Sequence, residues 1–292
     1  MRIAALDIGG TAIKSALWQE NMLTEQRETA TPVHSAQALL EQIYSIIESM
    51  GKIDAIGVCT RGTVGREGEI IFDGVLTGYT GTPLRALLEN RFQVPAAVEN
   101  DVNAAAVGEA NMGAGQDVPD FLMVTYGTAV GGAIVLNGNV YRGSSCSAGE
   151  FGGMQLFSHL AAENDPFGGF YENFAAASSL VKLVQQVRPQ VQNGKEVCKH
   201  LDDPAVASAV EEWVRRVSYG LSTLIHIFNP PLLVLGGGIM QNEALFRRVE
   251  QCTRGMVMPG FTPLVMKPAS LGNAAGMVGA ALLAKQRLEQ LR

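Results

Sequence analysis

The sequence contains no long hydrophobic run and no recognisable leader. None of its apolar stretches approaches the ~18 residues that would span a membrane. Met1-Arg2-Ile3 leads straight into a strand-like segment, without the charged and apolar regions of a signal peptide. We therefore expect a cytoplasmic protein that makes no membrane contact.

Paired cysteines and clusters of basic residues are also missing. The four cysteines stand singly, without the CxxC spacing of a zinc site or a redox dithiol; they are Cys59, Cys146, Cys198 and Cys252. The net charge is −6, and no basic cluster exceeds a pair such as Arg215-Arg216. We expect reduced, mostly structural cysteines and no binding of nucleic acid.

The sequence does contain enough apolar residues for real cores. Its 292 residues are 47% hydrophobic, and a chain of this length typically forms about two domains. Buried-strand patterns at residues 3–6, 53–58 and 96–98 alternate with helical patterns at residues 35–50 and 83–92. This alternation predicts an α/β fold.

The first glycine turn, Asp7-Ile8-Gly9-Gly10-Thr11, joins two strand patterns. Glycines at such a turn let backbone N–H groups approach a phosphate closely. Thr11 can add a hydroxyl donor, and Asp7 can hold a metal ion through water. An ordinary glycine hairpin would give the same pattern. A dinucleotide fold is excluded, because G-x-G-x-x-G is absent and no helix pattern follows.

A second turn of the same plan follows the strand pattern at residues 121–124. It runs Thr125-Tyr126-Gly127-Thr128-Ala129-Val130-Gly131-Gly132 and precedes a strand pattern at residues 133–136. Two such turns suggest two related domains, each offering a phosphate-binding hairpin to one cleft. Coincidence is the alternative, because 33 of the residues are glycine.

Residues 98–106 organise the rest of the chain. A short strand delivers Glu99, Asn100 and Asp101 to the start of a small-residue helix. Ligands of α/β proteins bind at the carboxyl ends of strands, so Asp101 can meet a substrate hydroxyl there and take its proton. The alternative is that Asp101 only caps the helix.

The second half adds two glutamates and another glycine turn. Glu150 lies in a glycine-rich loop and Glu172 follows Gly168-Gly169, although each alone could be a solvated surface charge. Gly236-Gly237-Gly238 follows a strand at residues 232–235 and could seat a base and ribose, or form a tight turn without a ligand.

A long amphipathic helix is predicted over residues 203–228, and a helix rich in alanine and leucine, with small residues for close packing, over residues 273–292. Trp213 belongs either to the core or to an interface. His226, at the end of its helix and far from any other histidine or cysteine in the sequence, is predicted to be structural.

Together these motifs resemble the ROK family (repressors, open reading frames and kinases) over nearly the whole chain. The specific elements are Glu99-Asn100-Asp101 followed by Ala148-Gly149-Glu150-Phe151-Gly152. The resemblance implies a two-lobed, actin-like (ribonuclease H-like) α/β fold that closes on ATP and a sugar in the interlobe cleft. The expected lobes are residues 1–116 with 274–292, and residues 117–273.

The resemblance also implies roles for individual residues. Asp101 would be the general base, with Asn100, Glu150 and Glu172 on the sugar and the loops at Gly62 and Gly74 beside it. The expected nucleotide contacts are Gly9, Gly10, Thr11, Gly127 and Thr128 on the phosphates, Gly237 and Gly238 on the adenosine, and Asp7 on Mg²⁺ through water.

Three departures from the family pattern matter. The usual zinc ligands are missing, since Gly153 replaces the histidine after the Ala-Gly-Glu motif and residues 164–170 hold no cysteine, so no zinc is expected. Ala129 replaces a glycine of the second phosphate loop and could strain a positive φ or only alter the turn. Arg61, in Thr60-Arg61-Gly62 instead of Ala-Pro-Gly, puts a cation near the sugar.

The resulting expectation is an ATP- and Mg²⁺-dependent sugar kinase that phosphorylates a hexose or β-glucoside hydroxyl, with O6 as the expected position. Alternatives are N-acetylmannosamine kinase or glucokinase activity, a sugar-sensing regulator, and a catalytically weak sugar-binding protein. A regulator of this family carries a helix-turn-helix domain before the first strand, which here begins at residue 3. The family resemblance and the apolar helix around Trp213 suggest a homodimer.

Overall fold

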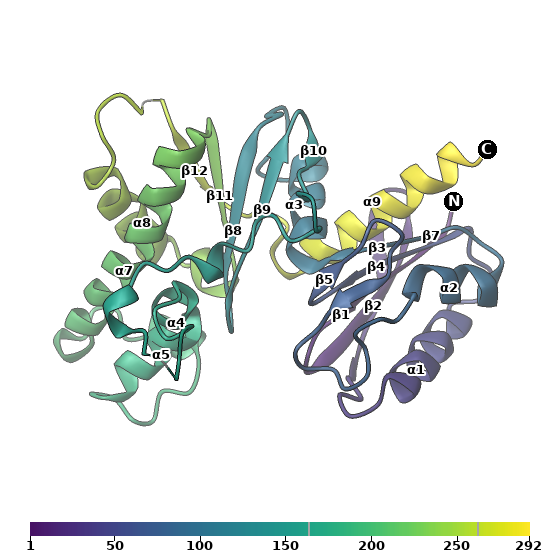
Figure 1. Cartoon of the computed structure of the whole chain (residues 1–292), viewed down its shortest axis with the longest axis horizontal. Coiled ribbons are helices and arrows are strands. Elements are labelled where there is room, and N and C mark those ends of the chain that lie inside the picture. Colours follow the sequence, from purple (N-terminus) through teal and green to yellow (C-terminus); the bar gives the residue numbers. More distant parts are fainter. Residues whose placement is uncertain (163, 262) are drawn as a thin grey trace. The chain divides into compact units, whose positions relative to one another are not determined.

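The computed structural model describes residues 1–162, 164–261 and 263–292. They form two compact units (Figure 1). Unit 1 comprises Met1–Met112, Arg142–Ala148 and Ala274–Arg292, and unit 2 comprises Gly113–Tyr141 and Gly149–Asn273. The contacts place Arg142–Ala148 in unit 1, whereas the sequence suggested that this segment belongs to the second lobe.

Unit 1 is built on a five-stranded sheet of order β3-β2-β1-β4-β7. Its strands are β1 (Ile3–Ile8), β2 (Ala12–Gln19), β3 (Met22–Ala30), β4 (Ala55–Thr60) and β7 (Ala96–Asn100). The first three form an antiparallel meander, and β4 and β7 run parallel to β1. Strand β3 was not predicted, because most of its side chains are exposed and it lacks an apolar pattern.

Helices cover both faces of this sheet. Leu39 and Ile43 of α1 (Ala36–Ser49) share a core with Leu84 of α2 (Leu84–Phe92) on one face. On the other face α3 (Asp101–Met112) and α9 (Ala275–Gln290) pack together, and a Cβ at Gly279 would overlap the backbone of α3. The short hairpin of β5 (Thr63–Val64) and β6 (Ile70–Phe72) completes the unit.

Unit 2 repeats the same sheet topology in the order β10-β9-β8-β11-β12. Its strands are β8 (Phe121–Tyr126), β9 (Val130–Leu136), β10 (Asn139–Val140), β11 (Leu232–Gly236) and β12 (Val265–Pro268). Again three strands form an antiparallel meander and two run parallel to the first. This equivalence favours two related domains over a chance repeat of the glycine turn.

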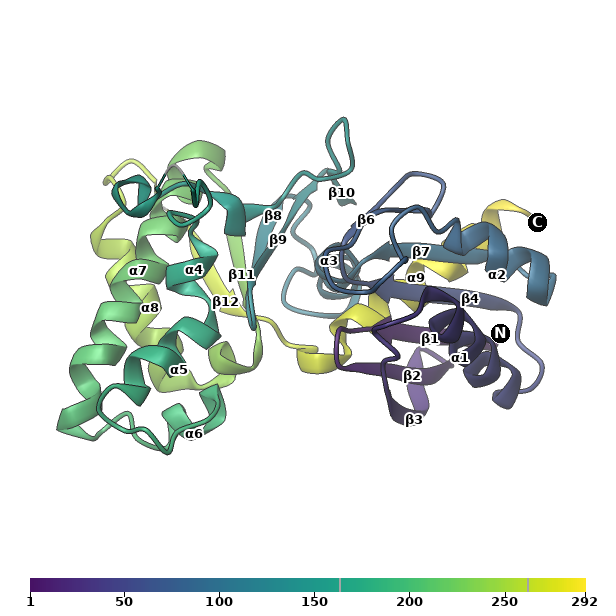
Figure 2. The same ribbon diagram turned by 60° about the horizontal axis from the view of Figure 1, so that its bottom comes forward.

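In the views of Figures 1 and 2 the helices of unit 2 stack to one side of its sheet. They are α4 (Glu172–Ala175), α5 (Ala177–Gln185), α7 (Pro204–Phe228) and α8 (Glu243–Gly255), joined by the short α6 (Gly194–Cys198). Trp213 of α7 is fully buried, and its Nε1 donates to the carbonyls of Ala175 and Ala176, each at 3.0 Å. Trp213 is therefore a core residue, so it offers no surface for a dimer.

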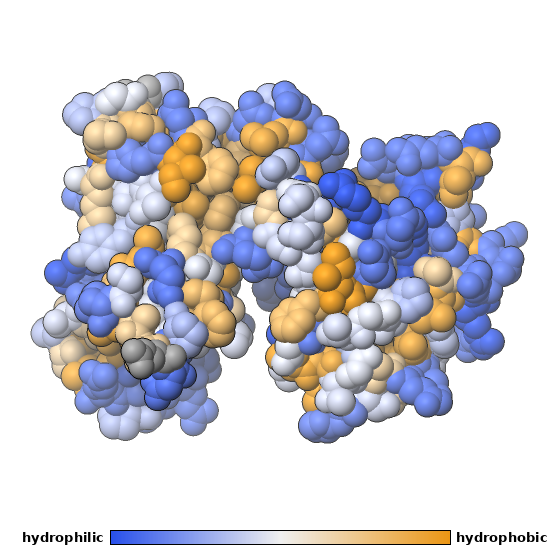
Figure 3. Space-filling model, in the orientation of Figure 1, coloured by the Kyte–Doolittle hydropathy of each residue, from blue (hydrophilic) through white to orange (hydrophobic). Residues whose placement is uncertain are grey.

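His226 has a structural partner, as predicted. Its Nε2 accepts a hydrogen bond from the backbone N–H of Met258 at 3.1 Å, and its ring packs edge-on against Phe261. No helix within the described residues is both long and apolar enough to cross a membrane. On the face drawn in Figure 3, hydrophilic and hydrophobic residues are mixed over each unit.

Candidate functional site

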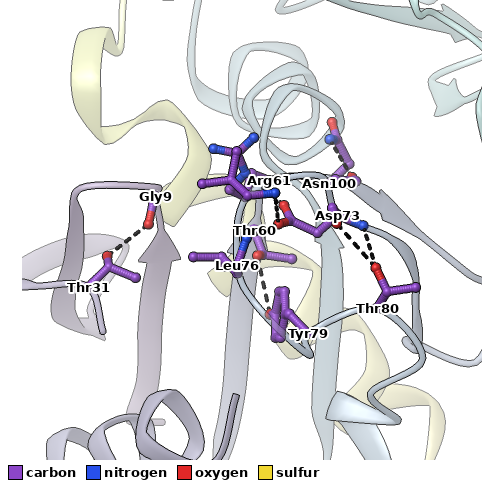
Figure 4. Close-up of polar contacts among 11 residues, drawn as sticks. Gly9, Thr31, Thr60, Arg61, Asp73, Leu76, Tyr79, Thr80 and Asn100 are labelled. Atoms are coloured by element: carbon purple, nitrogen blue, oxygen red, sulfur yellow. Dashed lines mark hydrogen bonds and ion pairs between the residues drawn. The ribbon is translucent and has the colours of Figure 1, made fainter. Parts of the chain in front are cut away.

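In unit 1, the Gly9-Gly10-Thr11 turn joins β1 to β2 and is held at both ends. The Gly9 N–H donates to the Ala12 carbonyl at 3.0 Å. The Thr31 hydroxyl donates to the Gly9 carbonyl at 2.8 Å (Figure 4). The Thr31 N–H donates to the Thr11 carbonyl at 3.0 Å. Thr31 therefore fixes the turn, a role that its position 20 residues downstream gave no sequence signal to reveal.

Asp7 lies near the end of β1, next to this turn. Its carboxylate is 21% exposed and 3.5 Å from the Lys14 ammonium on β2. Burial raises the pKa of Asp7, and Lys14 opposes that rise. A partly exposed carboxylate beside a glycine turn fits a ligand that reaches Mg²⁺ through water.

Asn100 and Asp101 stand where β7 ends and α3 begins. Oδ1 of Asn100 accepts from the N–H groups of Val102 at 2.9 Å and Asn103 at 3.1 Å, which is how a helix cap bonds. Asp101 Oδ1 also accepts from the Val102 N–H at 2.9 Å. Since Asn100 satisfies the N–H of Asn103, capping does not by itself explain a carboxylate at Asp101.

Glu99 supports this end of β7 through its side-chain contacts. It is 2% exposed, forms an ion pair with Arg142, and its Oε1 accepts from the Asn100 N–H at 2.8 Å and from Nδ2 of Asn103 at 3.2 Å. Oδ1 of Asn103 is the one buried side-chain polar atom in the described residues without a hydrogen-bond partner. The Glu-Asn-Asp motif gave a signal for Glu99, but none for its partner Arg142.

Gly62 and Gly74 belong to loops that pack around Asp73. Nδ2 of Asn100 donates to the Gly62 carbonyl at 3.0 Å, which orients the Asn100 amide. Gly62 has φ +83°, and a Cβ there would overlap the carbonyl of Phe72. Asp73 is buried, and its Oδ1 accepts from the N–H of Val75 at 2.8 Å, while Oδ2 accepts from Nε of Arg61 at 2.7 Å.

In unit 2, Glu150 and Glu172 form an acidic pair. Glu150 precedes the 3-10 turn Phe151–Gly153, and Glu172 begins α4. By surface area Glu150 is exposed, yet the protein around its carboxylate raises its pKa, and the charge of Glu172 adds to that rise. A Cβ at Gly152 would lie 3.0 Å from Oε2 of Glu172, so the absence of a side chain at this glycine lets the turn pack against Glu172.

The glycine turn of unit 2 is more open at Gly127 than the turn of unit 1 is at Gly9. No described atom outside the adjacent residues lies within 4 Å of a Cβ added at Gly127. Ser178 of α5 holds the turn, since its hydroxyl donates to the Thr128 carbonyl at 2.8 Å. Ala129 is not among the residues with positive φ, so it alters the turn without strain. The sequence gave no signal for Ser178.

The two glycines expected near the adenosine differ. Gly237 has φ +94°, and a Cβ there would overlap the Tyr126 carbonyl, so its lack of a side chain serves the packing of β11 on β8. Gly238 is exposed, and a Cβ there would meet no described atom within 4 Å beyond its chain neighbours. Gly238 leaves room for a ligand, whereas Gly237 has a structural reason of its own.

Two sheets of one topology, each with a glycine turn between its first two strands, define the class of two-lobed actin-like ATPases. The sequence matches the model of the ROK family over residues 3–287, so this chain belongs to the ROK family. The predicted family and fold class are both confirmed.

Individual relatives refine this assignment. The chain is 31% identical to a β-glucoside kinase of Listeria innocua over 96% of each sequence. It is also similar to the structure of a ROK family glucokinase from Streptomyces griseus in complex with glucose and AMPPNP, with a TM-score of 0.85, 28% identity, and 98% and 100% coverage of the two chains. A ROK family protein from Streptococcus pneumoniae in complex with sucrose gives a TM-score of 0.86 at 25% identity, with 99% and 100% coverage.

The chain is therefore an ATP-dependent sugar kinase. The individual site residues stay predictions. Within unit 1 the structure brings Asn100 to the Gly62 loop, and within unit 2 it brings Glu150 to Glu172. No cluster of three or more histidine, cysteine or acidic side chains arranged to hold a metal ion occurs among the residues described.

Proposed function

We propose that this kinase phosphorylates the O6 hydroxyl of a glucosyl ring and accepts β-glucoside disaccharides of the cellobiose type. The observation that carries the disaccharide preference is the open rim after the Ala148-Gly149-Glu150 motif. Gly153 is exposed and has no side chain, and the Phe170 ring lies 3.8 Å from the position of its missing Cβ.

The neighbouring segment adds aromatic surface to that rim. Phe167 is 62% exposed, and its ring centroid lies 5.1 Å from that of Phe170. Gln155, which could have filled the space, instead donates from Nε2 to the Pro166 carbonyl at 2.5 Å. Aromatic faces favour contact with the apolar face of a pyranose, so this rim suits a second sugar ring.

Asp101 would take the proton of the attacking hydroxyl, and Asn100, Glu150 and Glu172 would hold the other hydroxyls of the ring. The Asn100 amide uses one N–H on Gly62, and an amide carries two, so the other can reach a substrate oxygen. Because the pKa of Glu150 is raised, the charge of this sugar ligand, and with it the sugar affinity, should depend on pH.

The residues expected around the nucleotide fit ATP with Mg²⁺. The Gly9 N–H is bonded to the Ala12 carbonyl, so the backbone N–H groups of Gly10 and Thr11 would be the ones to face phosphate oxygens. Mg²⁺, when bound, would neutralise charge on the phosphates, and Asp7 would orient its water ligands. No zinc is expected, and metal analysis of the purified protein tests this; one zinc per chain would contradict it.

The substrate is tested by comparing kcat/KM for cellobiose, gentiobiose, glucose and N-acetylmannosamine under one set of conditions. We expect the disaccharides to be preferred, and NMR of the product to place the phosphate on O6. A clear preference for glucose or N-acetylmannosamine over both disaccharides would contradict the open-rim proposal and leave the kinase assignment unchanged.

Phe167→Ala makes this test specific to the rim. Removing the exposed ring should lower kcat/KM for cellobiose by about tenfold, the scale of one lost aromatic contact, and leave glucose unchanged. Equal losses for the disaccharide and the monosaccharide would place Phe167 outside the subsite of the second ring. Tyr141→Ala, which removes another exposed aromatic side chain, is the matched control.

A further inference from the structure

Arg61 lies in unit 1 near the end of β1, the end of β7 and the Gly9-Gly10-Thr11 turn. It follows β4, its backbone N–H donates to the Ile8 carbonyl at 3.3 Å, and the next residue, Gly62, accepts from Asn100. A Cβ added to Gly10 would lie 2.7 Å from Nη1 of Arg61, so the guanidinium rests directly on the phosphate turn. Arg61 thus reaches from the end that carries Asp101 to the glycines expected to face phosphate.

The guanidinium is held in place by a buried carboxylate. Nε of Arg61 donates to Oδ2 of Asp73 at 2.7 Å, and the Asp73 side chain is fully buried while that of Arg61 is 34% exposed (Figure 4). Asp73 is fixed in turn by the N–H groups of Val75 and Leu76 on its Oδ1. This ion pair does not use the Nη1 and Nη2 groups.

We propose that Arg61 binds the phosphoryl group in transfer, through the N–H groups of Nη1 and Nη2. A guanidinium matches two phosphate oxygens at once, and its charge stabilises the charge on the group as it moves. Asp73 is the positioning residue, since its hold on Nε fixes the rotation of the guanidinium. A side chain at Gly10 would require Nη1 to move from its present position.

A purely structural role for Arg61 makes different predictions. If Arg61 only neutralised Asp73, lysine could largely replace it, and its loss would affect stability or sugar affinity without distinguishing nucleotides. A residue on the transferred phosphoryl must instead distinguish a nucleotide with a γ-phosphate from one without it.

The test is a pair of titrations with AMPPNP and with ADP, both with Mg²⁺, on the wild type and on Arg61→Ala, together with kcat. We expect Arg61→Ala to lose about tenfold in affinity for AMPPNP, the scale of a hydrogen bond to a charged group, and to keep its affinity for ADP. We expect kcat to fall by about 100-fold, as when one transition-state donor is removed.

Three further variants sharpen the result. Arg61→Lys keeps the charge without the planar fork and should recover only part of kcat. Asp73→Asn keeps an oxygen for Val75 but cannot accept from Nε at the other atom, so it should weaken AMPPNP binding less than Arg61→Ala does. Arg27→Ala removes a cation of unit 1 that is 59% exposed in β3, and it should change neither nucleotide affinity. Thermal melting checks that each variant is folded.

The proposal rests on the phosphoryl transfer of the proposed function, but its test does not depend on which sugar is used. Equal losses for AMPPNP and ADP, or a change confined to the KM of the sugar, would overturn it. If Arg61→Ala loses affinity for AMPPNP but not for ADP, and the wild type prefers a monosaccharide, this inference stands and only the disaccharide preference is overturned.

Discussion

The two units share one sheet topology but hold their site residues by different means. Unit 1 adds two ion pairs of buried carboxylates to close glycine contacts such as that of Gly62, with Glu99 paired to Arg142 and Asp73 paired to Arg61. Unit 2 uses close backbone contact, as at Gly132, where a Cβ would overlap the carbonyl of Gly149 and the ring of Phe151. The same scaffold can thus be supported by ion pairs or by close packing at glycines. Substitutions should lower the stability of the two kinds of contact for different physical reasons.

The largest effect is expected from a change at Asp101, which lies at the end of β7 that Glu99 and Arg142 support. Asp101→Asn should lower kcat by at least about 100-fold, because the amide cannot accept the proton of the substrate hydroxyl. Sugar binding should be largely retained. Steady-state kinetics with a sugar titration measure both, and Asp202→Asn, at an exposed position, is the control. Near-full turnover by the variant would remove Asp101 from the mechanism.

In unit 2, an added side chain at a closely packed glycine should lower stability, because its atoms would overlap the neighbouring chain. Gly132→Ala should lower the free energy of unfolding by about 2 kcal/mol, because the added methyl must displace Phe151 and the carbonyl of Gly149. Gly255→Ala is the matched control, since a Cβ there meets no described atom within 4 Å outside its own helix turn and its chain neighbours. Chemical denaturation compares the two, and equal stabilities would show that β9 yields to the methyl.

In unit 1, removing the partner of a buried carboxylate should lower stability, because the carboxylate is then left without water and without its ion pair. Arg142→Ala leaves the buried Glu99 without its ion pair and should cost about 1–2 kcal/mol of unfolding free energy, reduced because Arg142 is itself 29% exposed. Arg85→Ala breaks a pair whose partner Glu67 is 80% exposed and should cost less than about 1 kcal/mol. If both variants lose the same stability, the buried position of Glu99 has no special weight.

The smallest effect concerns the acidic pair of unit 2. Burial and the neighbouring charge of Glu172 raise the pKa of Glu150, so sugar affinity should fall, as the pH is lowered, at a higher pH than for an ordinary glutamate. Glu172→Gln removes one cause of the rise and should move that midpoint to lower pH, whatever it does to affinity at neutral pH. Titrations of the sugar across acidic pH measure the midpoint, and an unmoved midpoint would assign the shift to burial alone.

The sequence by itself determined the α/β architecture and the family, whereas the roles of the site residues stay predictions. Buried strands such as β1 and β11 are continuous apolar runs, and α1 carries apolar residues at helical spacing with Ser35 as a cap whose Oγ accepts from the Ala38 N–H at 3.2 Å. These signals are local, because period and capping depend only on neighbouring residues. The family followed from ordered motifs for the same reason.

Only the tertiary structure decided how those positions are supported. The partnerships of Thr31 with Gly9, Arg142 with Glu99, and Ser178 with Thr128 join residues 22, 43 and 50 positions apart, which no local pattern records. It also separated glycines of equal appearance, since Gly237 is required by the Tyr126 carbonyl and Gly238 faces open space. Polar partners and close contacts depend on which strands become neighbours, and that is set by the assembly of the whole sheet.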